Sequence, residues 1–146
     1  MTRIEFYILK PNAEVGRLQL LDDLVHGLMR TGAAVHIHAC SARRRDDLRR
    51  RYREYTFGAE PALSIGHTGE PAQDMRVLVN MAPEVPHFFS RFDKTLEIID
   101  NDDHNKLLGR ERYQFYRNRG YPLVHHDIDG EAVRPRQDTL QYFEPA

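Results

Sequence analysis

Tryptophan is absent from this sequence, cysteine occurs once as Cys40, and no apolar run approaches the roughly 20 residues that a helix needs to cross a bilayer. A single cysteine excludes a disulfide within the chain and is compatible with the reducing cytosol. The first residues read as a short apolar strand flanked by Arg3 and Glu5, which is unlike a signal peptide. These absences favour a cytoplasmic globular protein.

An excess of charge of either sign is missing as well. The 21 Lys and Arg residues nearly balance the 22 Asp and Glu residues, so the formal net charge is −1. Composition therefore gives no reason to expect nucleic-acid binding over the whole surface, and such a role would need a local basic patch or a partner protein. With 146 residues, of which 40% are hydrophobic, the chain is long enough for one domain with a real core.

Short β-type segments alternate with helical ones along the chain. In residues 15–30, for example, Leu18, Leu21 and Leu24 recur at helical spacing, and Gly32 follows where a helix is expected to end. We expect strands at 4–9, 35–39, 63–65, 75–80, 95–99 and from 122, helices at 15–30, 42–55 and 106–121, and a helical turn at 88–92. Such alternation predicts parallel β-α-β units, and therefore a three-layer α/β/α domain with a mostly parallel, Rossmann-like sheet.

The predicted domain ends near residue 130. Residues 1–130 are expected to form a single α/β domain. Residues 131–146 are polar and contain proline, which predicts an extended or partly disordered C-terminal tail. Tyr142 and Phe143 could instead attach this tail to the body of the domain, and the sequence leaves that choice open.

A parallel α/β domain raises the question of a nucleotide site after the first strand. That connection, LKPNAEVGRL, contains only Gly16, and it matches neither G-x-G-x-x-G nor G-x-x-x-x-G-K-[ST]. Without a cluster of glycines the backbone offers no close approach for a phosphate group. We therefore expect the fold without a nucleotide site and without a bound cofactor.

Histidines suggest the main alternative, a small metal-dependent α/β hydrolase. His36 and His38 lie two residues apart on one expected strand and so point to the same face, and the string HHD follows at residues 125–127. A catalytic metal needs three or four such ligands that converge, and the helical H-E-x-x-H spacing is not present. We favour the simpler interpretation that the histidines lie near the surface. We interpret Cys40 as a small buried side chain at a strand end.

The predicted helix KLLGRERYQFYRNRGY, at residues 106–121, concentrates positive charge. Four of its residues recur at spacings of four, four and three and so share one side: Lys106, Arg110, Gln114 and Arg117. Tyr113 lies at the edge of this line, and Asp102 or Asp103 is expected to cap the helix. The apolar side is expected to consist of Leu107, Leu108, Phe115 and Tyr116. Such a helix suits an anionic ligand with an apolar end, although a solvated basic face explains the pattern equally well.

A second basic segment, residues 43–53 (RRRDDLRRRYR), holds seven arginines and two aspartates. The favoured interpretation is a solvated helix face in which Asp46 and Asp47 pair with Arg50 and Arg51 at four-residue spacing. The alternative is a patch that contacts an acidic partner or nucleic-acid phosphates. Because no exposed-looking aromatic residues are interleaved with these arginines, direct nucleic-acid binding is the weaker of those two options.

The string RERYxxYRxxGYxL, at residues 110–123, resembles the C-terminal signature of the chi subunit of bacterial DNA polymerase III. Two further segments agree with this family in the same order, FYIL at 6–9 and FFSRF at 88–92, the latter followed by LEII at 96–99. The resemblance implies an α/β fold that is not associated with nucleotide binding. It also implies an accessory subunit of the polymerase III holoenzyme that acts in DNA replication in the bacterial cytoplasm, close to the nucleoid, and has no catalytic activity of its own.

The resemblance further implies a ligand for the basic helix. Chi subunits bind the acidic C-terminal tail of the single-stranded-DNA-binding protein, which ends in Pro-Phe with a free carboxylate. The family's basic positions match Lys106 and Arg110, and a third commonly basic position is Gln114 here. The predicted binding set is Lys106, Arg110, Tyr113, Gln114 and Arg117. Val79 or Ile99 is a further candidate for the slot that takes the terminal phenylalanine ring.

The second partner implied by the resemblance is the psi subunit, through which chi subunits connect to the clamp-loader complex. Phe88, Phe89 and Phe92 are three aromatic residues within five positions, beside Pro83 and Pro86. Two interpretations stay open for them. Either all three close the core beneath a loop, or one or two remain exposed as apolar anchors for psi.

Overall fold

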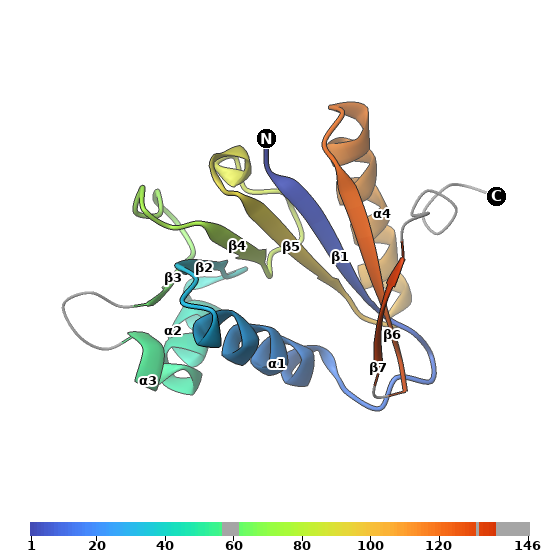
Figure 1. The fold of residues 1–146 in the computed structure, drawn as a ribbon, viewed down its shortest axis with the longest axis horizontal. Helices are drawn as coiled ribbons and strands as arrows, with labels where there is room; N and C mark the ends of the chain where they lie inside the picture. Colours follow the sequence, from blue (N-terminus) through green and yellow to red (C-terminus); the bar gives the residue numbers. More distant parts are fainter. Residues whose placement is uncertain (57–61, 131, 137–146) are drawn as a thin grey trace.

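The computed structural model describes residues 1–56, 62–130 and 132–136, which form one twisted sheet with helices on both faces (Figure 1). The strands lie in the order β3-β2-β4-β5-β1-β6-β7. Neighbours among β1 to β6 pair in parallel, and β7 pairs antiparallel with β6. The strands are β1 Arg3–Leu9, β2 Val35–His38, β3 Leu63–Gly66, β4 Val77–Asn80, β5 Lys94–Ile99, β6 Leu123–Asp129 and β7 Ala132–Arg136.

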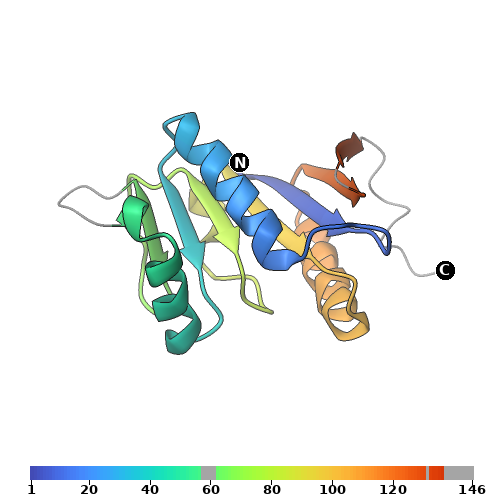
Figure 2. The same ribbon diagram turned by 90° about the horizontal axis from the view of Figure 1, so that it is seen from below.

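Helices connect β1 to β2, β2 to β3 and β5 to β6, which confirms the predicted α/β/α fold with a mostly parallel sheet (Figure 2). The helices are α1 Arg17–Arg30, α2 Ala42–Arg51, the single-turn α3 Arg53–Thr56 and α4 Asp103–Asn118, with a short 3-10 turn, η1 Phe89–Arg91. Within the described ranges, no helix combines the length and the apolar character needed to cross a bilayer.

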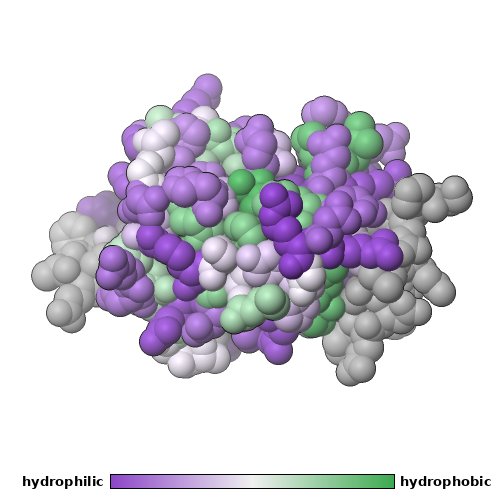
Figure 3. Space-filling model, turned by 90° about the horizontal axis from the view of Figure 1, so that it is seen from above, coloured by the Kyte–Doolittle hydropathy of each residue, from purple (hydrophilic) through white to green (hydrophobic). Residues whose placement is uncertain are grey.

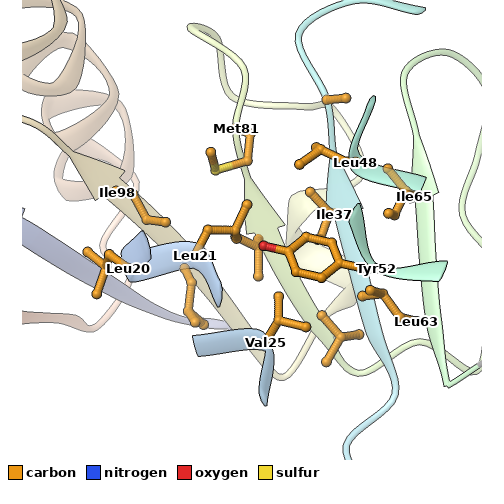
Figure 4. Packing of buried hydrophobic residues seen from close by; sticks show 14 of the residues in the cluster. Leu20, Leu21, Val25, Ile37, Leu48, Tyr52, Leu63, Ile65, Met81 and Ile98 are labelled. Carbon is orange, nitrogen blue, oxygen red and sulfur yellow. The ribbon is translucent and has the colours of Figure 1, made fainter. Parts of the chain in front are cut away.

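The sheet separates two apolar clusters because successive side chains of a strand point to opposite faces. On β4, Val77 and Val79 pack with residues of α1 and α2, whereas Leu78 packs in the cluster that contains residues of α4. Tyr52 lies at the centre of the first cluster, between α1 and the strands β2 and β3 (Figure 4). Most of the face seen in Figure 3 is hydrophilic, with hydrophobic groups showing between the polar ones, as is usual for a folded domain.

The connection between β4 and β5 covers its face of the sheet without an α-helix. Three phenylalanines of this connection take the place of a helix, with Phe88, Phe89 and Phe92 only 4%, 6% and 3% exposed. Phe89 makes edge contacts with Tyr116 of α4 and with Tyr121, at centroid distances of 5.3 and 5.0 Å. Of the two interpretations left open for these phenylalanines, the burial supports the one in which all three close the core, where their rings exclude water from this face.

His36 lies beneath the same phenylalanines and not near the surface, where it was expected. It is 5% exposed, its ring stacks on Phe92 and meets Phe88 edge-on, and its Nδ1 lies 2.5 Å from the Ser64 hydroxyl. Burial, with smaller contributions from the nearby His38, Arg49 and Arg91, lowers the pKa of His36 to about 4. The side chain is therefore neutral at physiological pH.

Part of the predicted C-terminal tail adds a strand to the sheet. Residues 132–136 form β7, which runs from Ala132 opposite Asp129 to Arg136 opposite His125. Residue 131 and residues 137–146, including Tyr142 and Phe143, lie outside the described residues. A domain boundary at residue 130 therefore stays a prediction.

The pKa of His36 predicts a loss of stability in mild acid that a substitution should reduce. Below about pH 6.5 the unfolded chain protonates this histidine, whereas the folded protein does so only near pH 4, so the free energy of unfolding falls as the pH drops between these values. In His36→Gln the contribution of this histidine to the loss of unfolding free energy, roughly 2 kcal/mol by pH 5.0, should be absent. Urea unfolding at pH 7.5, 6.0 and 5.0 measures it. His104→Gln, at an exposed position, is the matched control, and an equal change in both variants would contradict the assignment to burial.

Candidate functional site

Local signals fix both ends of α4, the helix that carries the predicted binding residues. The Asp102 carboxylate accepts a hydrogen bond from the backbone N–H of Asn105 at 3.0 Å, so Asp102 is the N-cap. After the helix, Gly120 adopts a φ of +78°, and its N–H donates to the carbonyl of Arg117. The expected cap and stop residues are therefore confirmed.

The buried face of α4 contains Gly109, Arg112, Tyr113 and Tyr116. Both tyrosines are fully buried, and their rings meet Phe6 of β1 at centroid distances of 5.5 and 6.0 Å. Gly109 permits a close approach to the sheet, because a Cβ at this position would lie 2.6 Å from Cδ1 of Ile99. The helix is therefore seated tightly on β5 and β1.

A buried carboxylate holds this face in place. Glu97 of β5 is 0% exposed, and its Oε1 accepts a hydrogen bond from Nε of Arg112 at 2.8 Å. Its Oε2 accepts from the hydroxyl of Tyr116 at 2.7 Å and from the amide of Asn80 at 3.0 Å. The Arg112 guanidinium also donates to the carbonyl of Pro83 at 3.0 Å. Burial, together with the charge of Glu97, raises the pKa of the Tyr116 hydroxyl.

The Glu97 network ties α4, β5 and the end of β4 together with charge-assisted hydrogen bonds. Sequence reasoning missed it, because Arg112 was counted only as part of a basic helix. A signal was present in the string LEII of β5, where a single carboxylate interrupts an otherwise apolar buried strand. A buried carboxylate requires a partner, and an arginine on the next helix is the obvious one.

The opposite face of α4 brings four of the five predicted binding residues together. Arg110 and Arg117 are exposed, and Lys106 and Gln114 are partly exposed on the same side of the helix. Within the described part of the chain, neither Lys106 nor Arg110 forms an ion pair with a carboxylate. Both cations are therefore available to an anionic ligand.

Tyr113, the fifth predicted residue, does not belong to this exposed face. Its side chain is 0% exposed, and Val79 and Ile99, the candidate walls of a ring slot, are 0% and 1% exposed. These three assignments are wrong because the residues fill the space between α4 and the sheet or, for Val79, the opposite core. None of them can contact a ligand without repacking.

Leu107 supplies an exposed apolar group at this face. It was expected on the buried side of the helix, yet it is 52% exposed. Arg110 lies three residues after it and Gln114 seven residues after it, so all three share one side of α4. The face therefore combines two available cations with an exposed aliphatic side chain. We refer to Lys106, Leu107, Arg110, Gln114 and Arg117 as the α4 face.

Three arginines of α2 form ion pairs with carboxylates. Arg51 pairs with Asp22 of α1 at 2.6 Å, Arg50 pairs with Asp47, and Arg45 pairs with Asp46 at 3.0 Å. A solvated, internally paired helix was the favoured interpretation, but the partners differ from those expected at four-residue spacing. Asp46 contacts its neighbour in sequence, and Arg51 contacts a carboxylate on another helix.

In the part of the chain that the structure describes, the histidines and Cys40 do not come together as a metal-binding group. Among the described residues, no three His, Cys, Asp or Glu side chains are grouped so that they could hold a metal ion. His125 is buried in the core, and Nε2 of His126 lies 2.9 Å from the carboxylate of Glu5. Burial opposes ionisation of Glu5, but hydrogen bonds from His126 and Arg3 outweigh it and lower the pKa of this carboxyl to about 2. Cys40 is exposed and not buried as expected.

Comparison with known proteins identifies the family. The model of the DNA polymerase III chi subunit, HolC, matches residues 51–124, which include β5, α4 and the start of β6. The chain belongs to the DNA polymerase III chi subunit family. It is also 28% identical over 139 residues to the DNA polymerase III subunit chi of Pseudomonas aeruginosa, a match that covers 88% of this chain and 98% of that protein.

Membership of the chi family makes the protein a component of DNA polymerase III and places it in DNA replication. It also confirms the resemblance drawn from residues 110–123. The structure shows that much of this signature serves the fold, since Arg112, Tyr113 and Tyr116 are buried. Arg110 is a signature residue whose charge is open to solvent, beside Leu107.

Removing Arg112 should destabilise the fold strongly. In Arg112→Ala the buried carboxyl group of Glu97 loses its main partner, so the free energy of unfolding should fall by about 3–5 kcal/mol. Arg110→Ala removes the same side chain two positions away on the exposed face and should change stability by less than about 0.5 kcal/mol. Unfolding in urea measures both. Similar losses in the two variants would show that the Glu97 network does not hold α4.

Proposed function

We propose that this chi-family protein is a non-catalytic accessory subunit that links the clamp-loader complex, through psi, to the C-terminal tail of the single-stranded-DNA-binding protein. The observation that carries the proposal is the α4 face, where Lys106 and Arg110 have no carboxylate partner among the described residues and Leu107 is exposed beside them. Membership of the chi family supports it independently.

The chemistry of the α4 face fits an acidic peptide with an apolar end. The ammonium group of Lys106 can pair with aspartate side chains of the tail as a mobile point charge. The planar guanidinium of Arg110 can hold the terminal carboxylate with two parallel hydrogen bonds. Leu107 offers an apolar contact to the terminal phenylalanine ring, in the role first assigned to Tyr113.

Gln114 reduces the charge of this face relative to the family pattern. Its amide can still donate a hydrogen bond to a carboxylate, but it contributes no Coulombic attraction. Because the remaining ion pairs are exposed to solvent, tail binding should weaken as salt rises. We expect the psi contact to use residues other than the phenylalanines of η1 and its flanks, because those lie in the core.

Loss of Arg110 should weaken tail binding without unfolding the protein. Titration with a fluorescent peptide that ends in Pro-Phe with a free carboxylate should show Arg110→Ala binding about 1–3 kcal/mol more weakly than wild type, because a charge-assisted contact is lost. A peptide without the terminal phenylalanine should bind poorly to both proteins. Arg43→Ala, at an exposed position on α2, is the control. Unchanged binding by Arg110→Ala would refute the assignment of the tail to the α4 face.

A positive charge at position 114 should strengthen binding of the tail peptide. In Gln114→Lys an exposed cation joins Lys106 and Arg110 on the same side of α4, so the tail peptide should bind about two- to fivefold more tightly at low salt. The gain should shrink as the salt concentration rises, because the added ion pair is screened. Fluorescence titration at two salt concentrations measures it. Tighter binding that is independent of salt would contradict this electrostatic role.

A further inference from the structure

Two adjoining clefts open at the carboxyl end of the parallel strands, and the smaller one is also lined by residues of α4, although by none that belongs to the α4 face. Their volumes are about 450 and 310 Å³, and they share Arg17, Cys40 and Met81 in their linings. Cys40 follows β2, Met81 follows β4, and Arg17 begins α1. This edge of the sheet is where open α/β folds bind their ligands.

The larger cleft has an apolar interior. Leu48 and Met81 are each 7% exposed and form its floor with Ala39, at the margin of the cluster drawn in Figure 4. Leu18 lines the cleft while 47% exposed, although a large aliphatic side chain near the start of an amphipathic helix would normally pack inward. Together these side chains form an apolar surface that is open to a ligand.

Positive charge predominates among the residues that line this larger cleft. They include three arginines, Arg17, Arg44 and Arg51, and one carboxylate, Asp47. Arg51 is held by Asp22, and Asp47 is held by Arg50.

Two of these arginines are open to an anion. Arg44 has no carboxylate partner in the ranges that the structure describes, and Arg17 donates only to the carbonyl of Met81, at 3.2 Å. Burial lowers the pKa of Arg17, and the nearby Asp100 opposes this effect. An anion bound here would therefore offset part of the free-energy cost of removing the Arg17 guanidinium from water.

The lining also indicates which anion fits. No aromatic residue is among the side chains that surround the larger cleft, so a nucleobase would find no ring to stack on. The preceding loop, residues 10–16, contains Gly16 as its single glycine and provides no phosphate-binding backbone motif. The aliphatic side chains inside the cleft and the arginines at its edge instead fit a peptide in which carboxylates flank an aliphatic side chain.

We infer that this cleft binds an acidic segment of a partner protein, with one aliphatic side chain against Leu18 and Met81 and its carboxylates at Arg17 and Arg44. The site lies on α1 and α2 and shares no residue with the α4 face, so it does not depend on the proposed tail binding. The protein would then have two separate docking sites for acidic peptides.

Cys40 makes the inference directly testable, because it is the single cysteine of the chain, is exposed and lines the cleft. The probe is the peptide Asp-Asp-Leu-Asp-Asp with both ends blocked, which has no free terminal carboxylate. It should slow the alkylation of Cys40 by N-ethylmaleimide, an uncharged reagent, in a saturable manner and at least fivefold. Peptides with alanine in place of leucine, or asparagine in place of aspartate, should protect much less.

Matched charge reversals locate the bound peptide. Arg44→Glu should raise the peptide concentration needed for half-maximal protection of Cys40 at least tenfold. Arg43→Glu makes the same change at an exposed neighbouring residue that does not line the cleft, and protection should persist. Equal effects of the two substitutions, or no saturable protection of wild type, would overturn the inference.

Two further measurements distinguish a peptide bound in the cleft from a nucleotide site and from a peptide bound at the α4 face. Protection by ATP or by oligodeoxythymidine, but not by the peptide, would overturn the inference in favour of a nucleotide or nucleic-acid site. Arg110→Ala should leave protection of Cys40 unchanged. If it abolishes protection, the peptide binds at the α4 face, and the cleft is excluded while the proposed tail binding stands.

Discussion

The carboxylate of Glu97 is the constraint on which the candidate site depends. A charge with no exposed surface is costly unless every lone pair has a donor nearby, and here three side chains supply those donors from two other elements. Because Arg112 and Tyr116 must reach this one point, α4 can sit on the sheet in only one rotation about its axis. That rotation turns Lys106, Leu107 and Arg110 to solvent.

The same interaction explains why a motif associated with binding is largely buried. Arginines and tyrosines that lie close together on a helix look like a cationic, aromatic surface when they are read as sequence. In the folded protein the arginine at position 112 satisfies an internal carboxylate, and Tyr113 and Tyr116 close the core. Helical spacing alone could not show whether an arginine lies on the surface or in the core. The buried carboxylate of Glu97 makes a buried arginine favourable, and the position of that carboxylate depends on the tertiary structure.

Much of the fold was predictable because it depends on local signals. Alternation of apolar strands and amphipathic helices indicated the parallel sheet, and Asp102 and Gly120 marked the ends of α4. The phenylalanines of the β4–β5 connection were not predictable, since their burial depends on the absence of a helix from that connection. Cys40 likewise follows a buried strand and yet lies exposed, because the strand ends at a cleft. Such positions are decided by how distant elements pack, which a linear pattern does not contain.

The position of β1 in the sheet has a consequence for how the protein is made. Ile4 lies opposite Thr95 of β5 on one side and Leu123 of β6 on the other, so β1 leaves the ribosome well before either of its two neighbours. During synthesis its backbone has no partner strand until β5 has emerged. The nascent chain therefore presents an unpaired apolar strand to the cell, and the domain can close around it only once β6 is complete.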